Sequence, residues 1–206
     1  MAKPTILLLT HKTITIMKKL FCLICVAMFA VTASAQVTWN MKGGFGVATC
    51  YGSDTDGLKS HLVGKIGVGL EYPLSSNVSL MPSLEFAWKG TEMKDDDFKT
   101  TLDLYYLQVP VVFAYRMNLA DAWNMTLKAG PYFAYAVSDK IKMESSYGNY
   151  DGSADVKKFD AGLDAGIDFE YHRFVFGVEA ELGFLKLDGD SNVKNLAFYA
   201  TLGWKF

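Results

Sequence analysis

The feature that most constrains the fold is a strict alternation of apolar and polar residues over positions 159–171. The segment reads FDAGLDAGIDFEY, with apolar side chains at the odd positions and only Asp, Glu or Gly at the even ones. Successive side chains of a β-strand point to opposite faces, whereas a helix repeats every 3.6 residues. The segment is therefore predicted to be a strand with one apolar face and one polar face.

The same period-two pattern recurs in seven further segments separated by polar turns. They cover residues 37–51, 62–72, 77–89, 101–116, 123–137, 174–185 and 196–206. None carries a sustained helical period, so little helix is expected. The last segment ends on the bare aromatic Phe206, which is predicted to terminate a strand that closes a barrel against the first one.

The connections between these segments alternate in length. Residues 51–61, 90–100 and 138–158 are long connections, 188–194 is moderate, and 73–76, 117–122 and 172–173 are short. Long loops at one end and tight turns at the other are typical of outer-membrane barrels. The predicted fold is therefore all-β, an eight-stranded antiparallel up-and-down transmembrane β-barrel.

The N-terminal region has the pattern of a secretory signal peptide. Two lysines, an apolar run over 20–31 and the small-residue motif Ala33-Ser34-Ala35 follow Met17. We expect residues 1–16 to be an over-long start, residues 17–35 the signal peptide, and residues 36–206 the barrel domain. An uncleaved membrane anchor is the alternative. Cleavage would leave Cys50 as the one cysteine of the mature chain, without a partner for a disulfide.

Charge limits the classes of partner. The predicted signal region removes four of the 20 basic residues and none of the 22 acidic ones, which leaves a net charge of −6. Nucleic-acid binding needs a basic surface, so no nucleic-acid partner is expected.

Volume decides which face points inward. An eight-stranded barrel is only just wide enough for side chains to fill it, and the apolar face carries too many large aromatics to fit. The polar face mixes glycines with charged residues of both signs, including Lys89 and Lys205, which can pair inside a narrow lumen. A soluble barrel with an apolar interior is the alternative. The predicted lumen charge network consists of Lys42, Lys65, Glu71, Glu85, Arg116, Lys128, Asp160, Asp164, Asp168, Glu170, Glu179 and Glu181.

Aromatic residues near the strand ends support a membrane location. Tyr and Trp are enriched at both membrane interfaces, where they form girdles around a barrel. The predicted girdle residues are Trp39, Tyr72, Trp88, Tyr105, Tyr115, Trp123, Tyr171 and Trp204.

Three segments carry a resemblance to a known family. YYLQVPVVFAYR at 105–116, KAGPYFAY at 128–135 and the strand pair from Phe159 to Phe184 resemble the small outer-membrane β-barrel "porin family" proteins common in Bacteroidetes. The resemblance covers nearly the whole mature chain. It implies an outer-membrane location and an eight-stranded barrel, and it offers no catalytic residue.

Candidate catalytic residues are few. Barrel enzymes that act on lipid A resemble acyl-transfer enzymes and need a histidine with a serine or base partner. His61, near Ser60 and Ser53, is the one position where such a pair could form, and His172 is expected to have a structural or solvated role. The carboxylates of the lumen face are read as a charge network, with a cation path as the alternative.

These observations predict a non-enzymatic outer-membrane barrel with a largely plugged lumen, which serves envelope integrity or surface interaction through its loops. A narrow porin for small solutes or ions is the alternative, and a lipid-modifying enzyme a more distant one. No cofactor or metal is expected. The expected partners are outer-membrane lipid and lipopolysaccharide, the barrel-assembly machinery, and an unknown extracellular partner.

Overall fold

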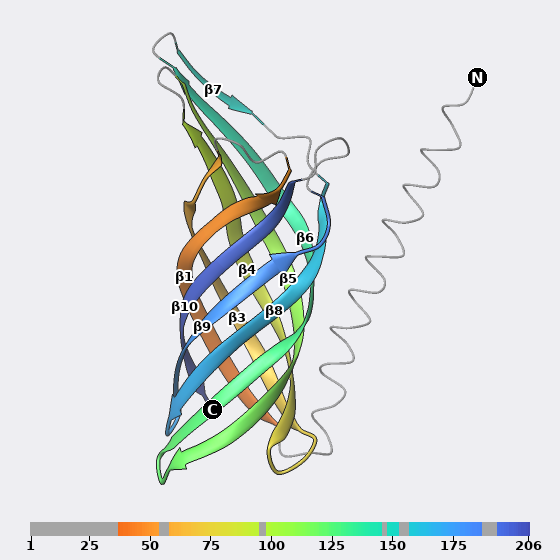
Figure 1. The fold of residues 1–206 in the computed structure, drawn as a ribbon, viewed down its shortest axis with the longest axis vertical. Helices are drawn as coiled ribbons and strands as arrows, with labels where there is room; N and C mark the ends of the chain where they lie inside the picture. The colour runs from red at the N-terminus through yellow and green to blue at the C-terminus, as the bar shows by residue number, and fades with distance from the viewer. Residues whose placement is uncertain (1–36, 54–57, 95–97, 146–147, 153–156, 187–192) are drawn as a thin grey trace, which may run out of the picture. The chain divides into compact units, whose positions relative to one another are not determined.

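Eight long antiparallel strands and two short ones make up the described part of the chain (Figure 1). The computed structural model describes residues 37–53, 58–94, 98–145, 148–152, 157–186 and 193–206, so the predicted signal peptide lies outside the described residues. No described helix is long and apolar enough to cross a membrane. The long strands are β1 (Thr38–Gly52), β3 (His61–Pro73), β4 (Val78–Lys94), β5 (Phe98–Ala120), β6 (Trp123–Ser145), β8 (Phe159–Tyr171), β9 (Phe174–Gly183) and β10 (Val193–Lys205), and the short ones are β2 (Leu58–Lys59) and β7 (Gly148–Gly152).

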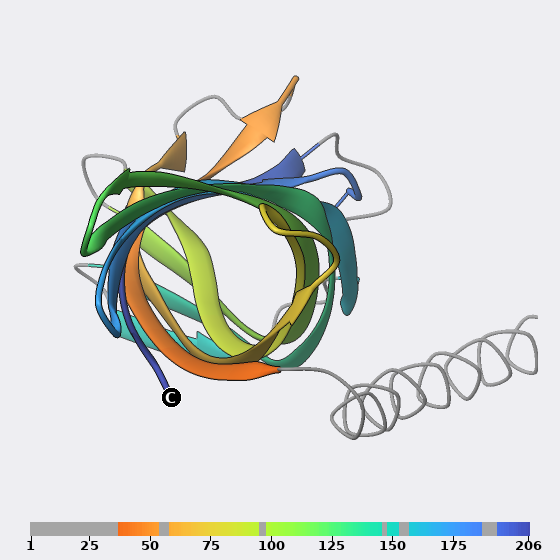
Figure 2. The ribbon, with the colours of Figure 1, turned by 90° about the horizontal axis from the view of Figure 1, so that it is seen from below.

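The eight long strands close into a ring, which Figure 2 shows along its axis. Each pairs with its neighbour in the chain, and β1 also pairs antiparallel with β10, from Asn40 opposite Lys205 to Gly52 opposite Val193. The short strands β2 and β7 add to β4 and β6. The predicted eight-stranded antiparallel barrel is therefore confirmed.

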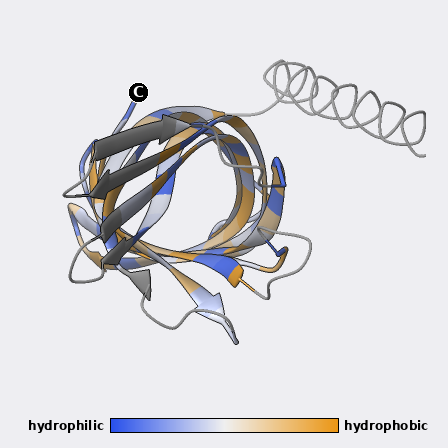
Figure 3. Cartoon of the chain, turned by 90° about the horizontal axis from the view of Figure 1, so that it is seen from above, coloured by the Kyte–Doolittle hydropathy of each residue, from blue (hydrophilic) through white to orange (hydrophobic). Residues whose placement is uncertain are grey.

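The two faces of each strand differ as the alternation predicts. In β8, the even-numbered acidic residues are buried and Ile167 is 38% exposed. Figure 3 shows the same alternation of polar and apolar positions around the barrel wall. Two residues predicted for the lipid face are buried instead: Leu70 lies opposite Trp39, and Val109 lies opposite Phe133. Both sit beside a large aromatic on the neighbouring strand, which can cover them.

Two of the predicted long loops are largely strand. β4 runs to Lys94 and β5 starts at Phe98, so most of 90–100 belongs to a hairpin. β6 continues to Ser145 and pairs with β7, which takes up much of 138–158. These strand ends project at the upper end of the barrel in Figure 1. Their backbone hydrogen bonds extend the wall of the barrel beyond its apolar band.

The other end of the barrel carries tight turns. β3 and β4, β5 and β6, and β8 and β9 are joined there by residues 74–77, 121–122 and 172–173. His172 has a φ of 54°, a left-handed conformation in which histidine is one of the commoner non-glycine residues. Phe206 lies at the same end, where its N–H donates to the carbonyl of Trp39 at 2.9 Å.

Candidate functional site: the lumen charge network

Charged side chains of the polar face fill the lumen in three layers. The layer nearest the tight turns joins Arg116 and Lys205 to two carboxylates. Arg116 Nη2 lies 2.6 Å from Glu71 and 3.2 Å from Glu170, and Lys205 Nζ lies 2.8 and 2.7 Å from the same two residues. Two cations and two anions balance each other here, as buried charges require.

The middle layer is the densest and is centred on Glu179 and Glu181 of β9. Glu179 forms ion pairs with Lys42 of β1, Lys65 of β3 and Lys128 of β6. Lys65 also lies 2.8 Å from Glu181, and both Lys65 and Glu181 are buried. Because the partners come from strands on different sides of the ring, these contacts cross the lumen.

Further contacts extend the middle layer. Lys128 Nζ lies 2.5 Å from Asp168, and Lys65 Nζ lies 3.3 Å from Glu85. Gln108 of β5 donates from its amide to Glu85 at 3.1 Å and to Glu181 at 2.8 Å. Seven of the eight barrel strands therefore contribute a polar side chain to this layer.

The layer nearest the long hairpins is aromatic and contains one carboxylate. Asp160 accepts hydrogen bonds from the Tyr132 hydroxyl at 3.0 Å and from the Asn195 amide at 2.9 Å. Lys89 Nζ lies 4.5 Å from the ring centre of Tyr132 and 2.6 Å from Glu181. Lys89 therefore links the aromatic layer to the middle one, and its ammonium gains a cation–π contact.

All twelve residues of the predicted network lie on the lumen wall, but they are not all paired. Asp164 is only 3% exposed, and its Oδ1 has no hydrogen-bond partner among the described residues. The described ion pairs join Arg116 to Glu71 and Glu170 rather than to a mid-lumen acid. The alternation predicts which residues share the lumen but not which of them touch.

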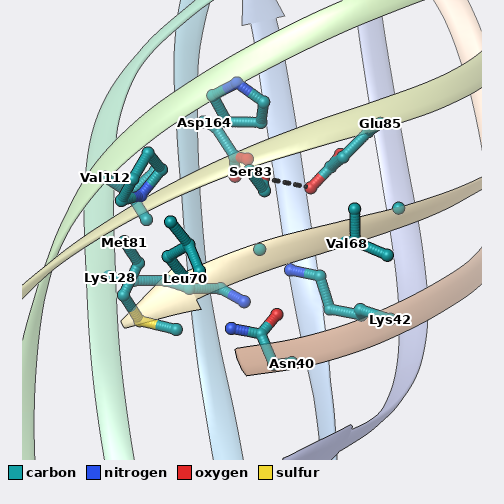
Figure 4. A pocket seen from close by; sticks show the side chains of 14 residues that line it. Asn40, Lys42, Val68, Leu70, Met81, Ser83, Glu85, Val112, Lys128 and Asp164 are labelled. Atoms are coloured by element: carbon teal, nitrogen blue, oxygen red, sulfur yellow. Dashed lines mark hydrogen bonds between the residues drawn. The ribbon is translucent and has the colours of Figure 1, made fainter. Parts of the chain in front are cut away.

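Small cavities lie beside the charged side chains of the lumen. One, of about 20 Å³, is lined by Lys42, Glu85, Lys128 and Asp164 together with apolar side chains (Figure 4). Another, also about 20 Å³, lies beside Asp168 and Lys205. A cavity needs about 10–15 Å³ of such volume to hold one water molecule, so each accommodates about one.

The predicted network was built from charged residues, so it did not include the uncharged side chains that also lie in the lumen. Tyr106, Tyr132 and Gln108 are fully buried there, and Thr126 donates to Glu170 at 3.0 Å. The adjacent pair Tyr105–Tyr106 could have predicted one such residue, because successive side chains of a strand point to opposite faces and one of the two rings must therefore face the lumen.

The predicted girdle residues fall into two groups. Six lie near the tight turns, namely Trp39, Tyr72, Tyr115, Trp123, Tyr171 and Trp204, and the other two, Trp88 and Tyr105, are register partners toward the long hairpins. Trp88 lies eight positions after Leu80, the partner of Tyr72. At about 3.3 Å per residue and a tilt of about 40°, the groups stand about 20 Å apart along the axis, close to the apolar band of a membrane barrel.

The two histidines have separate surroundings. His61 lies with Nε2 3.3 Å from Asp103 and Nδ1 3.9 Å from Glu92, so its described ionic partners are carboxylates. His172 lies in the β8–β9 turn with its ring 4.6 Å from that of Tyr171. Among the residues whose positions are described, no cluster of three or more His, Cys, Asp or Glu could hold a metal ion.

Comparison with known proteins identifies the class. The sequence model of the family described as "Outer membrane protein beta-barrel domain" matches residues 29–189. The chain therefore belongs to this family, and it is a multi-pass β-barrel of the outer membrane. No curated protein matches the sequence significantly.

Solved structures resemble this chain at low sequence identity. Neisserial surface protein A is 11% identical, with a TM-score of 0.50 over 82% of this chain and 97% of that one. The attachment invasion locus protein Ail of Yersinia pestis is 15% identical, with a TM-score of 0.45 over 82% and 98%. The outer membrane enzyme PagL is 12% identical, with a TM-score of 0.45 over 82% and 98%. At 11% identity the likeness to Neisserial surface protein A shows the fold alone.

Proposed function

We propose that this protein is a non-enzymatic outer-membrane barrel with a plugged lumen, which serves envelope integrity or surface interaction through its projecting hairpins. The observation that carries the proposal is the set of ion pairs from Glu179 and Glu181 to lysines across the lumen. The finer resemblance to porin-family barrels of the Bacteroidetes type is part of the same proposal.

Energetics support a plug over a channel. A buried ion pair is costly to break, because removal of one partner leaves an uncompensated charge at a cost of about 3–5 kcal/mol. A hydrated ion that crosses the middle layer would have to displace several such pairs at once. Eight strands give an interior that side chains just fill, and each of the two cavities described above holds about one water.

A non-enzymatic role has its own support. The candidate catalytic residue His61 has both ring nitrogens against carboxylates, those of Asp103 and Glu92. Acyl transfer of the kind considered for lipid A enzymes needs the histidine to reach a serine hydroxyl.

Planar-bilayer recording tests the plug. We expect the wild-type protein to show no steady conductance, whereas Lys65→Ser combined with Glu181→Ser should produce one. The double variant removes both partners and so leaves less uncompensated charge than either single change. Lys140→Ser with Asp103→Ser, which are register partners outside the lumen layers, is the matched control. A steady wild-type channel would favour the narrow porin instead.

A further inference from the structure

A lysine stands at or just beyond the long-hairpin end of each of three neighbouring strands. β8, β9 and β10 lie side by side in the barrel wall (Figure 1). At this end Phe159 and Leu196 are apolar residues of β8 and β10, and the exposed Phe184 and Leu185 follow β9 directly. Lys194 of β10 is the next outward residue beyond Leu196, because it lies within the strand. Lys157 stands two residues before the start of β8 and Lys186 three residues after the end of β9, and both are exposed. Apolar residues and a lysine therefore stand close together at the same end of each of the three strands.

These lysines differ from the other charges of the rim. Among the described residues at these strand ends, the one acid is Asp160, which is buried in the lumen, and no described carboxylate forms an ion pair with the three lysines. On β6, by contrast, Lys140 lies opposite Asp103 in register. Among the described residues, the sector over β8, β9 and β10 thus carries three lysines that form no ion pair with a carboxylate.

At one edge of this sector, Lys194 contacts an aromatic ring of the neighbouring strand. Lys194 lies opposite Tyr51 in register, with its Nζ 5.6 Å from the ring centre. The Tyr51 hydroxyl donates to the carbonyl of Gly183 at 2.5 Å, which ties β1 to β9 across β10. Lys194 is accordingly half-buried, with its charge held at the boundary rather than free in solution.

We propose that Lys157, Lys186 and Lys194 form a binding site for the phosphates of lipopolysaccharide in the outer leaflet. This site would make lipopolysaccharide the lipid partner in the envelope role proposed above, and the inference rests on that proposed function. The apolar residues below the lysines contact acyl chains, and the lysines meet the headgroup where its phosphates lie. Basic residues near an anionic lipid surface each strengthen binding to it, so three lysines favour a phosphorylated lipid.

Lipid retention tests the site. The full-length protein is folded into nanodiscs of phosphatidylcholine that contain either bisphosphorylated or dephosphorylated lipid A, and the lipid A retained on purification is measured. We expect the wild type to retain the bisphosphorylated form preferentially. Lys157→Gln with Lys186→Gln and Lys194→Gln should weaken that preference about 10- to 100-fold. Lys140→Gln, whose neighbour is acidic, is the matched control and should behave as the wild type.

Several outcomes would overturn the proposal. They are equal retention of both lipids by the wild type, an unchanged preference in the triple variant, or an equal loss in the Lys140→Gln control. Circular dichroism in the same nanodiscs verifies that the triple variant is folded, and single substitutions replace it if it is not. A wild type that lacks this preference but does not conduct would overturn this site alone, whereas steady conductance would overturn the plug alone.

Discussion

Ile167 and Asp168 are neighbours in β8 that face opposite environments. Ile167 is 38% exposed on the outer wall and lies between Leu127 and Val178 in register, away from both strand ends. We predict that Ile167→Arg lowers the free energy of unfolding by about 2–4 kcal/mol, because no water or partner reaches the guanidinium at that depth. Denaturant unfolding in lipid vesicles measures this change.

Two controls accompany that substitution: one changes a residue nearer the membrane interface, and the other changes a residue on the lumen face. Phe174→Arg, at the tight-turn end, should cost about 0–1 kcal/mol because the charge reaches the interface. Asp168→Asn removes a partner of Lys128, which keeps Glu179, and should cost about 1–3 kcal/mol with little dependence on salt. A tolerated Ile167→Arg together with a lipid-exposed Asp168 would show that the two faces are inverted.

Gly162 is a position where the lumen requires the absence of a side chain. A Cβ there would collide with the carbonyl of Leu182 and come within 2.7 Å of the Tyr132 ring. We predict that Gly162→Ala destabilises the barrel by about 1–3 kcal/mol, because the backbone at Leu182 and the buried Tyr132 ring must both move. At Gly43 the nearest atom would be 3.8 Å away, so Gly43→Ala should change stability by less than about 0.5 kcal/mol. The same unfolding assay compares the two, and equal effects would contradict the packing argument.

For single residues, the sequence predicts which face of the barrel wall a side chain lies on, but not which other side chains it contacts. Alternation is a local property, so it placed Glu181 and Lys65 in the lumen without any knowledge of strand order. Their contact depends on how far each strand is staggered around the closed ring, which is a property of the whole barrel. For this reason the unpaired Oδ1 of Asp164 and the central role of Gln108 could not be read from the pattern.

Closure between β1 and β10 is the element on which the barrel depends. Phe206 continues this pairing with one backbone hydrogen bond to Trp39. We predict that deletion of Phe206 lowers the yield of folded barrel more than Phe206→Ala, which keeps the N–H donor. Refolding into vesicles, followed by the mobility of unheated samples on gels, measures the yield. Equal yields for the wild type and both variants would show that closure does not need this residue.

At the element scale, the apolar strands were predictable and the projecting strand ends were not. Within the membrane band one face contacts lipid and the other the lumen, so the alternation is strong. Beyond Gly90 and Ser138 the strands continue past the apolar band, where no hydrophobic period is required. Polar sequence there favoured a loop, whereas backbone pairing with the neighbouring strand continued the hairpin.

The orientation of the whole molecule follows from the difference between its two ends. In outer-membrane barrels the short turns face the periplasm and the longer connections face outward. Ser60, between β2 and β3, is exposed at the long-hairpin end, and Ser75 is exposed in a tight turn. We predict that Ser60→Cys reacts with a membrane-impermeant maleimide on intact cells, whereas Ser75→Cys reacts only after the outer membrane is permeabilised. The wild type is the blank, because Cys50 is buried. Labelling of Ser75→Cys but not Ser60→Cys on intact cells would reverse the orientation and place the lysines of β8, β9 and β10 on the periplasmic side.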